Sequence, residues 1–154
     1  MPIEDPENIV LEFYKSFDDR NIERAFSFLD ESFIAHMAGI PELMNREKFQ
    51  QFGMEFYSAF AEGQHKFEEI IATENKVVTC GTFTAKHLGE FQGLPPTGKQ
   101  IEISIMHIDR VENGKIVEHW GQGDAQGLMQ QLGIMFVPSP KLIPYIVKNI
   151  FFKF

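Results

Sequence analysis

An Asn-Gly pair at residues 113–114 constrains the topology of this chain more than any other short feature. A two-residue hairpin loop needs positive φ at its central positions, and Asn and Gly adopt that conformation most easily. Residues 100–111 alternate apolar and polar side chains before the pair, and residues 116–123 form the returning stretch. The pattern therefore predicts two antiparallel strands joined by this turn.

Two more strands are predicted upstream, over residues 66–73 and 76–87, with a turn at Glu74 and Asn75 between them. Residues 93–98 contain a Pro-Pro pair, and proline has no N–H to give to a central strand, so we expect a loop there. The second half of the chain thus predicts an antiparallel meander.

The first 63 residues follow a different, helical period. Asp5 is a good N-cap and Pro6 suits the first position of a helix, while Asn21 and Asn45 are N-caps for two more helices. Gly63 is predicted to end the third helix. Helices followed by an antiparallel meander indicate an α+β domain, in which a curled sheet wraps around the helices and leaves a pocket at its open end.

A length of 154 residues fits one domain, and no linker or low-complexity tract divides the chain. We expect residues 1–137 to form that domain. Residues 138–154 are apolar with interspersed lysines, and we expect them to be an extension packed on the domain or on a dimer partner. A lid over the pocket and a helix on a membrane surface are the alternatives for this extension. The 16 phenylalanines either fill the core or line a pocket for a flat, apolar ligand.

The composition argues against several classes of function. A formal net charge of −8 disfavours binding to nucleic acid, which requires clustered Lys and Arg. Cys80 is the only cysteine, and the five histidines show neither His-Glu-x-x-His nor His-x-His spacing, so we expect no metal. A glycine-rich phosphate loop and a Gly-x-Ser-x-Gly motif are both absent from the sequence. We therefore expect no cofactor, and a small apolar or aromatic molecule as the partner.

The chain begins with an acidic, polar stretch, and no apolar run approaches the roughly 18 residues of a membrane span. These features predict a cytoplasmic protein without stable membrane insertion.

Asp124 is the first candidate for chemistry. Strict alternation along residues 116–123 places Trp120 on one face of the strand, and Asp124 continues that register. A carboxylate with apolar walls is a stronger base, able to remove a proton next to a carbonyl. Because a short helix is predicted over residues 125–132, Asp124 can equally serve as its N-cap.

His107 is the second candidate. A two-residue turn at 113–114 places it opposite Trp120 on the neighbouring strand. A histidine among isoleucines can polarise a carbonyl or shuttle a proton, or it can be a core histidine with a hydrogen-bonded neighbour.

The other histidines are weaker candidates. His36 ends a short strand-like stretch, and His87 ends the strand over residues 76–87, so both are expected on the polar rim of the pocket. His65 and His119 read as exposed or structural residues.

Two stretches carry a resemblance to a known family. Residues 87–99 read His-Leu-Gly-Glu-Phe-Gln-Gly-Leu-Pro-Pro-Thr-Gly-Lys, and residues 113–133 run from Asn-Gly-Lys-Ile-Val-Glu-His-Trp through Asp124 to Gln-Gln-Leu-Gly. In order and spacing they resemble the SnoaL-like polyketide cyclases, over residues 6–133. The resemblance implies an NTF2-like, cystatin-like cone-shaped barrel with N-terminal helices packed on a curved, mainly antiparallel sheet. It also implies a homodimer, as in many such folds.

The resemblance further implies a mechanism. Family cyclases close a ring by intramolecular aldol condensation of an aromatic polyketide ester, without a cofactor, and an aspartate after the Trp acts as general acid/base. That aspartate corresponds to Asp124, with His107 beside it. The expected substrate-binding residues are Trp120, His36, His87, Phe56 and Phe91. The alternative function is a non-catalytic protein that binds a small molecule.

Overall fold

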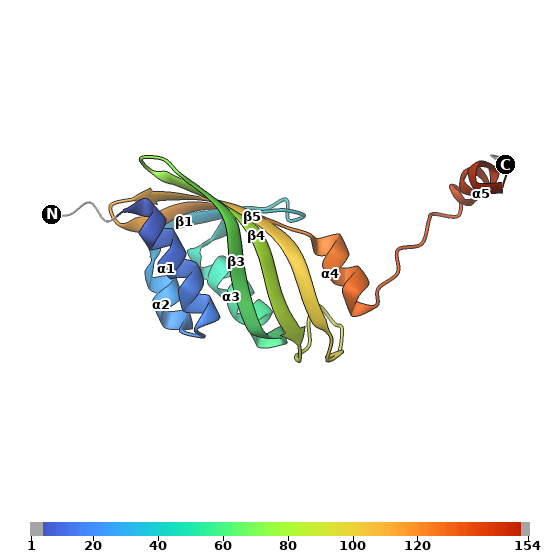
Figure 1. Ribbon diagram of the computed structural model, residues 1–154, viewed down its shortest axis with the longest axis horizontal. Coiled ribbons are helices and arrows are strands. Elements are labelled where there is room, and N and C mark those ends of the chain that lie inside the picture. Colours follow the sequence, from blue (N-terminus) through green and yellow to red (C-terminus); the bar gives the residue numbers. More distant parts are fainter. Residues whose placement is uncertain (1–4, 152–154) are drawn as a thin grey trace.

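The computed structural model describes residues 5–151, which form one curved sheet with helices against one face (Figure 1). The six strands follow the order β2-β1-β6-β5-β4-β3, so the sheet is open between its edge strands β2 and β3. The strands are β1 (Leu29–Met37), β2 (Met44–Asn45), β3 (Phe60–Ala72), β4 (Lys76–His87), β5 (Gln100–Glu112) and β6 (Lys115–Gly123). The helices are α1 (Pro6–Asp18), α2 (Ile22–Ser27), α3 (Arg46–Ala59), α4 (Ala125–Leu132) and α5 (Ile143–Phe151). The α+β architecture expected from the sequence is confirmed.

The starts of the first three helices follow from short polar side chains. The side chain of Asp5 accepts a hydrogen bond from a backbone N–H in the first turn of α1, and Asn21 and Asn45 do the same for α2 and α3. Each cap satisfies one of the N–H groups that a helix start leaves without a partner. All three N-caps predicted from the sequence are confirmed.

The predicted meander is also present. β3, β4, β5 and β6 pair antiparallel in chain order, and Asn113 and Gly114 have φ of 49° and 75° at the turn. β1 then pairs parallel with β6, which makes the sheet mixed. Through this pairing, β1, which lies between α2 and α3 in the chain, is placed beside β6, the last strand of the domain.

Gly63 does not end the third helix, contrary to the sequence prediction, because α3 stops at Ala59 and Gly63 lies within β3. A Cβ at position 63 would lie 2.7 Å from the ring of Phe83 on β4. The glycine therefore permits close packing across the β3–β4 pair rather than a helix C-cap.

A β-bulge near the start of β6 decides which side chains face the helices. Val111 pairs with Ile116, but its neighbour Arg110 pairs with Glu118, so Val117 is an extra residue in β6. Such a bulge shifts the alternation of faces by one residue. Ile116 and Val117 are accordingly both buried.

Downstream of the bulge, the faces are opposite to those that strict alternation predicts. His119 and Gly121 are buried on the inner face of the sheet, the face that α1 and α3 cover. Trp120 alternates with them, is only partly buried and lies on the outer face, away from the cavity. His107 pairs with Gly121, not with Trp120 as predicted. The sequence prediction placed Trp120 on the pocket side because it assumed strict alternation of faces, and that pattern does not reveal the extra residue at the bulge.

Two apolar clusters occupy the inner face. One joins α1, α2 and α3 to β1 and the nearby strands, and the other packs α4 and the end of α3 on β4 and β5. Tyr57 and Phe67 border both clusters. The clusters leave a cavity between them, which is the site described below.

The described part of the carboxyl-terminal extension, which reaches residue 151, lies away from the domain of its own chain. Residues 152–154 of the predicted extension lie outside the described residues. Gly133, with φ of 102°, ends α4, and the chain then runs out to α5 (Figure 1). Exposed apolar side chains mark this segment: Met135, Phe136, Val137, Leu142, Ile143, Tyr145, Ile146 and Val147. Packing of residues 138–154 on a second copy therefore stays a prediction. No helix in residues 5–151 has the length and apolar character needed to cross a membrane.

Candidate active site

The inner face of the sheet and the helices enclose a cavity of about 370 Å³, which is within the range of small-molecule sites. Most of its wall is aromatic or aliphatic. Phe56 and Phe91, both predicted from the sequence, line it. The titratable side chains on the described wall are Tyr14, Tyr57, His65, His107 and His119.

A buried carboxylate organises one side of this wall. Asp109 is fully buried on β5, directly opposite His119 of β6. Its carboxylate accepts a hydrogen bond of 2.7 Å from Nδ1 of His119 and one of 2.8 Å from the hydroxyl of Tyr14 on α1. Because a carboxylate only accepts, Nδ1 of His119 carries a proton and Nε2 is the nitrogen left for other chemistry.

Gly121 keeps the neighbourhood of that nitrogen open. A Cβ at position 121 would lie 2.8 Å from Nε2 of His119, which is too close for a normal contact. Within residues 5–151, no hydrogen bond to this Nε2 is formed. The glycine and the Asp109 contact together leave His119 oriented, with its second nitrogen free beside the cavity.

His107 stays neutral at this site. Burial lowers its pKa well below the ordinary value of 6.5, and the nearby His119 and His65 lower it further. The His107 ring stacks on Tyr14 at 5.2 Å between centroids and lies 5.3 Å from the ring of His119. The structure thus places His107 on the cavity wall, as the sequence analysis expected.

Tyr14 likewise stays uncharged. Burial raises the pKa of its phenol well above 10, and the charge and hydrogen bond of Asp109 add to that rise. At neutral pH the hydroxyl therefore remains a donor to Asp109. Tyr14 therefore supports the carboxylate rather than supplying a second negative charge.

The depressed pKa of His107 makes stability depend on pH. Between the folded pKa and the unfolded value near 6.5, the unfolded chain binds a proton that the folded chain does not. Stability from the neutral ring is complete above about pH 6.5 and is lost as the pH falls below it, by at most about 1.4 kcal/mol per pH unit. Urea unfolding at pH 7.5, 6.5 and 5.5 should show a shallower pH slope for His107→Gln than for the wild type. Parallel slopes for the two proteins would contradict this account.

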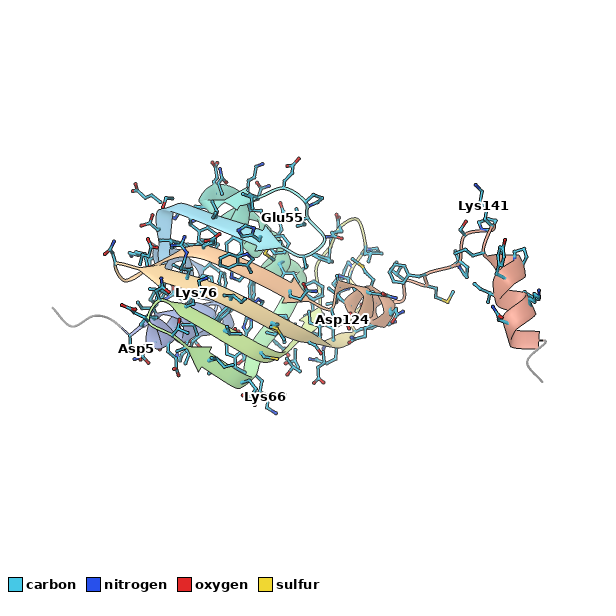
Figure 2. The ribbon with its side chains drawn as sticks, turned by 90° about the horizontal axis from the view of Figure 1, so that it is seen from above. Asp5, Glu55, Lys66, Lys76, Asp124 and Lys141 are labelled. Atoms are coloured by element: carbon cyan, nitrogen blue, oxygen red, sulfur yellow. The ribbon has the colours of Figure 1, made fainter. Side chains whose placement is uncertain are left out.

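Asp124 lies outside the cavity. It is exposed at the junction of β6 and α4 (Figure 2), and its Oδ1 accepts a hydrogen bond of 2.8 Å from the N–H of Gly127. It borders an adjoining hollow that shares Gln122, Gly123 and Ala125 with the cavity wall, although Asp124 itself does not line the cavity. The expectation that Asp124 projects into an apolar pocket beside Trp120 is wrong, because the bulge reverses the faces and the chain enters α4 immediately. The alternative interpretation, an N-cap, describes its position.

Trp120 and His36 also lie outside the cavity. Their rings stack at 4.9 Å on the outer face, where His36 is hydrogen bonded to Glu118 at 2.8 Å. Lys76 of β4 lies over the Trp120 ring at 5.7 Å (Figure 2 labels Lys76 on this face). These two sequence candidates form a surface cluster that is separate from the cavity.

His87 is a core residue rather than part of a polar rim. It is fully buried, stacks on Phe60 at 5.1 Å, and its Nδ1 accepts a hydrogen bond from the backbone N–H of Thr97. This contact ties the end of β4 to the Pro-Pro loop. The structure therefore gives His87 a role in holding that loop.

Tyr14, Asp109 and His119 were not predicted as site residues from the sequence. One signal was available, because Asp109 continues the alternation of Ile103, Ile105 and His107, and a carboxylate on an apolar face needs a partner. No local pattern identifies His119, whose inward direction depends on the bulge at Val117. In the sequence, Tyr14 is one of the apolar positions of an amphipathic helix, so nothing marks it as a site residue.

The profile of the family described as SnoaL-like polyketide cyclase matches residues 8–132, most of the chain. The chain belongs to the SnoaL-like polyketide cyclase family. The resemblance noted in the sequence is thereby confirmed for the domain, and the extension beyond residue 133 lies outside the matched region.

Known cyclases are among the relatives of this SnoaL-like chain. It is 33% identical over 107 residues to the aklanonic acid methyl ester cyclase DnrD of Streptomyces peucetius, covering 66% of this chain and 70% of that protein. A second such cyclase, DauD of Streptomyces sp. strain C5, matches at 33% over 107 residues, and the match covers 63% of its length. Among solved structures, IdmH of Streptomyces antibioticus, a proposed polyketide cyclase, aligns with a TM-score of 0.74 at 25% identity. That alignment covers 84% of this chain and 99% of IdmH.

Proposed function

We propose that this protein is a cofactor-independent cyclase of the aldol type, which removes a proton next to a carbonyl of a flat, apolar substrate. The observation that carries the proposal is the Asp109–His119 pair, one buried and oriented base on an otherwise apolar cavity wall. Family membership supports ring closure as the reaction, because the curated relatives are named as cyclases.

In this mechanism, Nε2 of His119 takes the α proton. Asp109 holds the imidazole in one tautomer and stabilises the imidazolium that forms, and Tyr14 fixes the carboxylate in turn. An uncharged His107 on the same wall is available to donate a ring N–H to the carbonyl oxygen as the enolate develops. An aspartate therefore takes part, but it is Asp109 acting through His119, and Asp124 serves as the cap of α4.

The first substrate to test is aklanonic acid methyl ester, which the names of the curated relatives supply. A second probe, 2-tetralone, separates proton removal from ring closure, because exchange of its α hydrogens in D₂O requires only a base. We expect the purified protein to catalyse both reactions. Binding of either compound without acceleration of either reaction would support the alternative function, a protein that holds small molecules in its apolar cavity without turnover.

Asp124 provides a matched control for the role of His119. Asn caps a helix about as well as Asp, so Asp124→Asn should keep its fold and its rate of α exchange. Asp124→Ala should lose about 1 kcal/mol of stability from the missing cap, measured by urea unfolding, and should also remain active. Loss of exchange in a folded Asp124→Asn protein would return the acid/base role to Asp124.

We also propose that the chain forms a homodimer through the outer face of its sheet. Met106 and Ile108 project from that face with 49% and 36% exposure, next to the Trp120 and His36 cluster. The apolar extension carries lysines and no acidic residue, so it complements the acidic domain of a second copy. Sedimentation equilibrium at micromolar concentration should give a dimer mass, and a monomer mass would refute the proposal.

A further inference from the structure

A second histidine held by an aspartate, His65, lines the same cavity and has no part in the mechanism above. Nδ1 of His65 on β3 is hydrogen bonded at 2.6 Å to Oδ1 of Asp18, the last residue of α1. The other carboxylate oxygen accepts the backbone N–H of His65 at 3.0 Å. The two side chains are only 9% and 13% exposed, so the pair is held firmly in a largely apolar environment.

This second pair has the same design as the first. As with His119, a carboxylate holds Nδ1, and Nε2 forms no hydrogen bond within the described part of the chain. Helix α1 supports both pairs from one face, because Tyr14 binds Asp109 and Asp18, one turn later, binds His65. The position of one helix thus sets the orientation of both histidines.

The two pairs stand at the ends of a continuous row of rings along the cavity wall. Successive ring centroids are separated by 5.1 Å from His65 to Tyr14, 5.2 Å from Tyr14 to His107, and 5.3 Å from His107 to His119. All four rings line the cavity. A flat molecule lying against this row would meet one carboxylate-backed histidine at each end.

An intramolecular aldol closure needs proton transfer at two different atoms. One C–H bond breaks at the α carbon, the new C–C bond forms to the acceptor carbonyl, and the resulting alkoxide takes a proton to complete an O–H bond. A single base can serve a simple double-bond shift, where the same proton leaves and returns. Two separated acid–base groups suit ring closure instead.

Resting on the function proposed above, we propose that His65, oriented by Asp18, is the second acid–base group of this site. In this step His65 starts as the imidazolium, with a proton on each ring nitrogen and Asp18 as its counterion, and its Nε2–H gives a proton to the alkoxide. Nε2 of a neutral His119 accepts the α proton. At the end of the reaction His119 is protonated and His65 is neutral, and proton exchange with water restores the starting state. The substrate class follows: a molecule with an enolisable carbon and a second carbonyl that receives it.

The test compares the two reactions in His65→Gln. Ring closure of aklanonic acid methyl ester should fall by about 10²–10⁴, the usual contribution of a general acid, while α exchange of 2-tetralone should fall by less than about tenfold. The dependence of the ring-closure rate on pH should also lose the step that reports the protonated general acid. His119→Gln is the matched control, because it should lower both reactions together. Equal losses in the two reactions, or unchanged closure, would overturn the role of His65.

Two further measurements test the role of His65 if His65→Gln unfolds or if aklanonic acid methyl ester is not the substrate. Asp18→Asn keeps an oxygen that can accept the backbone N–H, so it should remain folded by circular dichroism and show the same selective loss of closure. In NMR titrations, the planar probe 1,8-dihydroxyanthraquinone should shift the ring signals of both His65 and His119. A shift of His119 alone would count against His65 even if aklanonic acid methyl ester is not the substrate. Absence of α exchange in the wild type would instead defeat the proposed function itself.

Discussion

His119→Gln is expected to lower the rate of α exchange and of ring closure by about 10²–10⁴, the contribution typical of a positioned general base. Glutamine has nearly the reach of histidine and its N–H can still donate to Asp109, so the buried carboxylate keeps a partner. Its amide group is not a base at neutral pH. The loss should therefore appear in turnover with little change in thermal stability.

Steady-state kinetics with 2-tetralone and with aklanonic acid methyl ester measure this effect. The control is Asp124→Asn, which changes a carboxylate at the exposed start of α4, outside the cavity wall. A loss of kcat in His119→Gln with activity retained in Asp124→Asn supports His119 as the base. The reverse pattern would show that the cavity wall described above does not carry the chemistry.

Asp109→Ala is expected to produce the largest loss of stability of any single change in the site. It removes the acceptor for two buried donors, the Tyr14 hydroxyl and Nδ1 of His119. Each buried donor left without a partner costs about 1–3 kcal/mol, so the variant should lose roughly 2–6 kcal/mol of unfolding free energy. That is a large share of the stability of a domain of this size.

Urea unfolding at pH 7.5 measures this loss, and Glu112→Ala is a suitable comparison on the same strand. Glu112 is exposed at the hairpin end of β5, where removal of a surface carboxylate changes stability by at most about 1 kcal/mol. Tyr14→Phe should fall between the two, because it removes one donor and leaves Asp109 bonded to His119. A stable, unchanged Asp109→Ala protein would mean that the buried network contributes little to folding.

The structure also distinguishes His107 from the other two histidines on the cavity wall. His107 has no carboxylate partner, and its Nδ1 is buried without a hydrogen bond from the described residues. Desolvation therefore dominates and keeps the ring neutral. His119 and His65 each have a carboxylate hydrogen bonded to Nδ1. A carboxylate at Nδ1 is therefore what distinguishes His119 and His65 from the neutral His107.

Much of this fold could be predicted from local sequence. The caps at Asp5, Asn21 and Asn45 and the Asn113-Gly114 turn depend on contacts within a few residues. The four-stranded meander follows from the alternation of its strands and the turns between them. Caps and tight turns follow from backbone conformation and short-range hydrogen bonds, so a local sequence pattern can predict them. The sequence resemblance likewise identified the family over the region that its profile matches.

The site depended on features that no local pattern contains. One extra residue, Val117, turns His119 and Gly121 towards the helices and Trp120 away from them, because a strand reverses its faces with every added residue. Asp109 acquires its partners only when α1 packs across β5 and β6, and His65 acquires Asp18 from the end of the same helix. The sequence by itself determined the elements and their order. Tertiary packing decided which carboxylates stand behind a histidine on the cavity wall and which, like Asp124, only cap a helix.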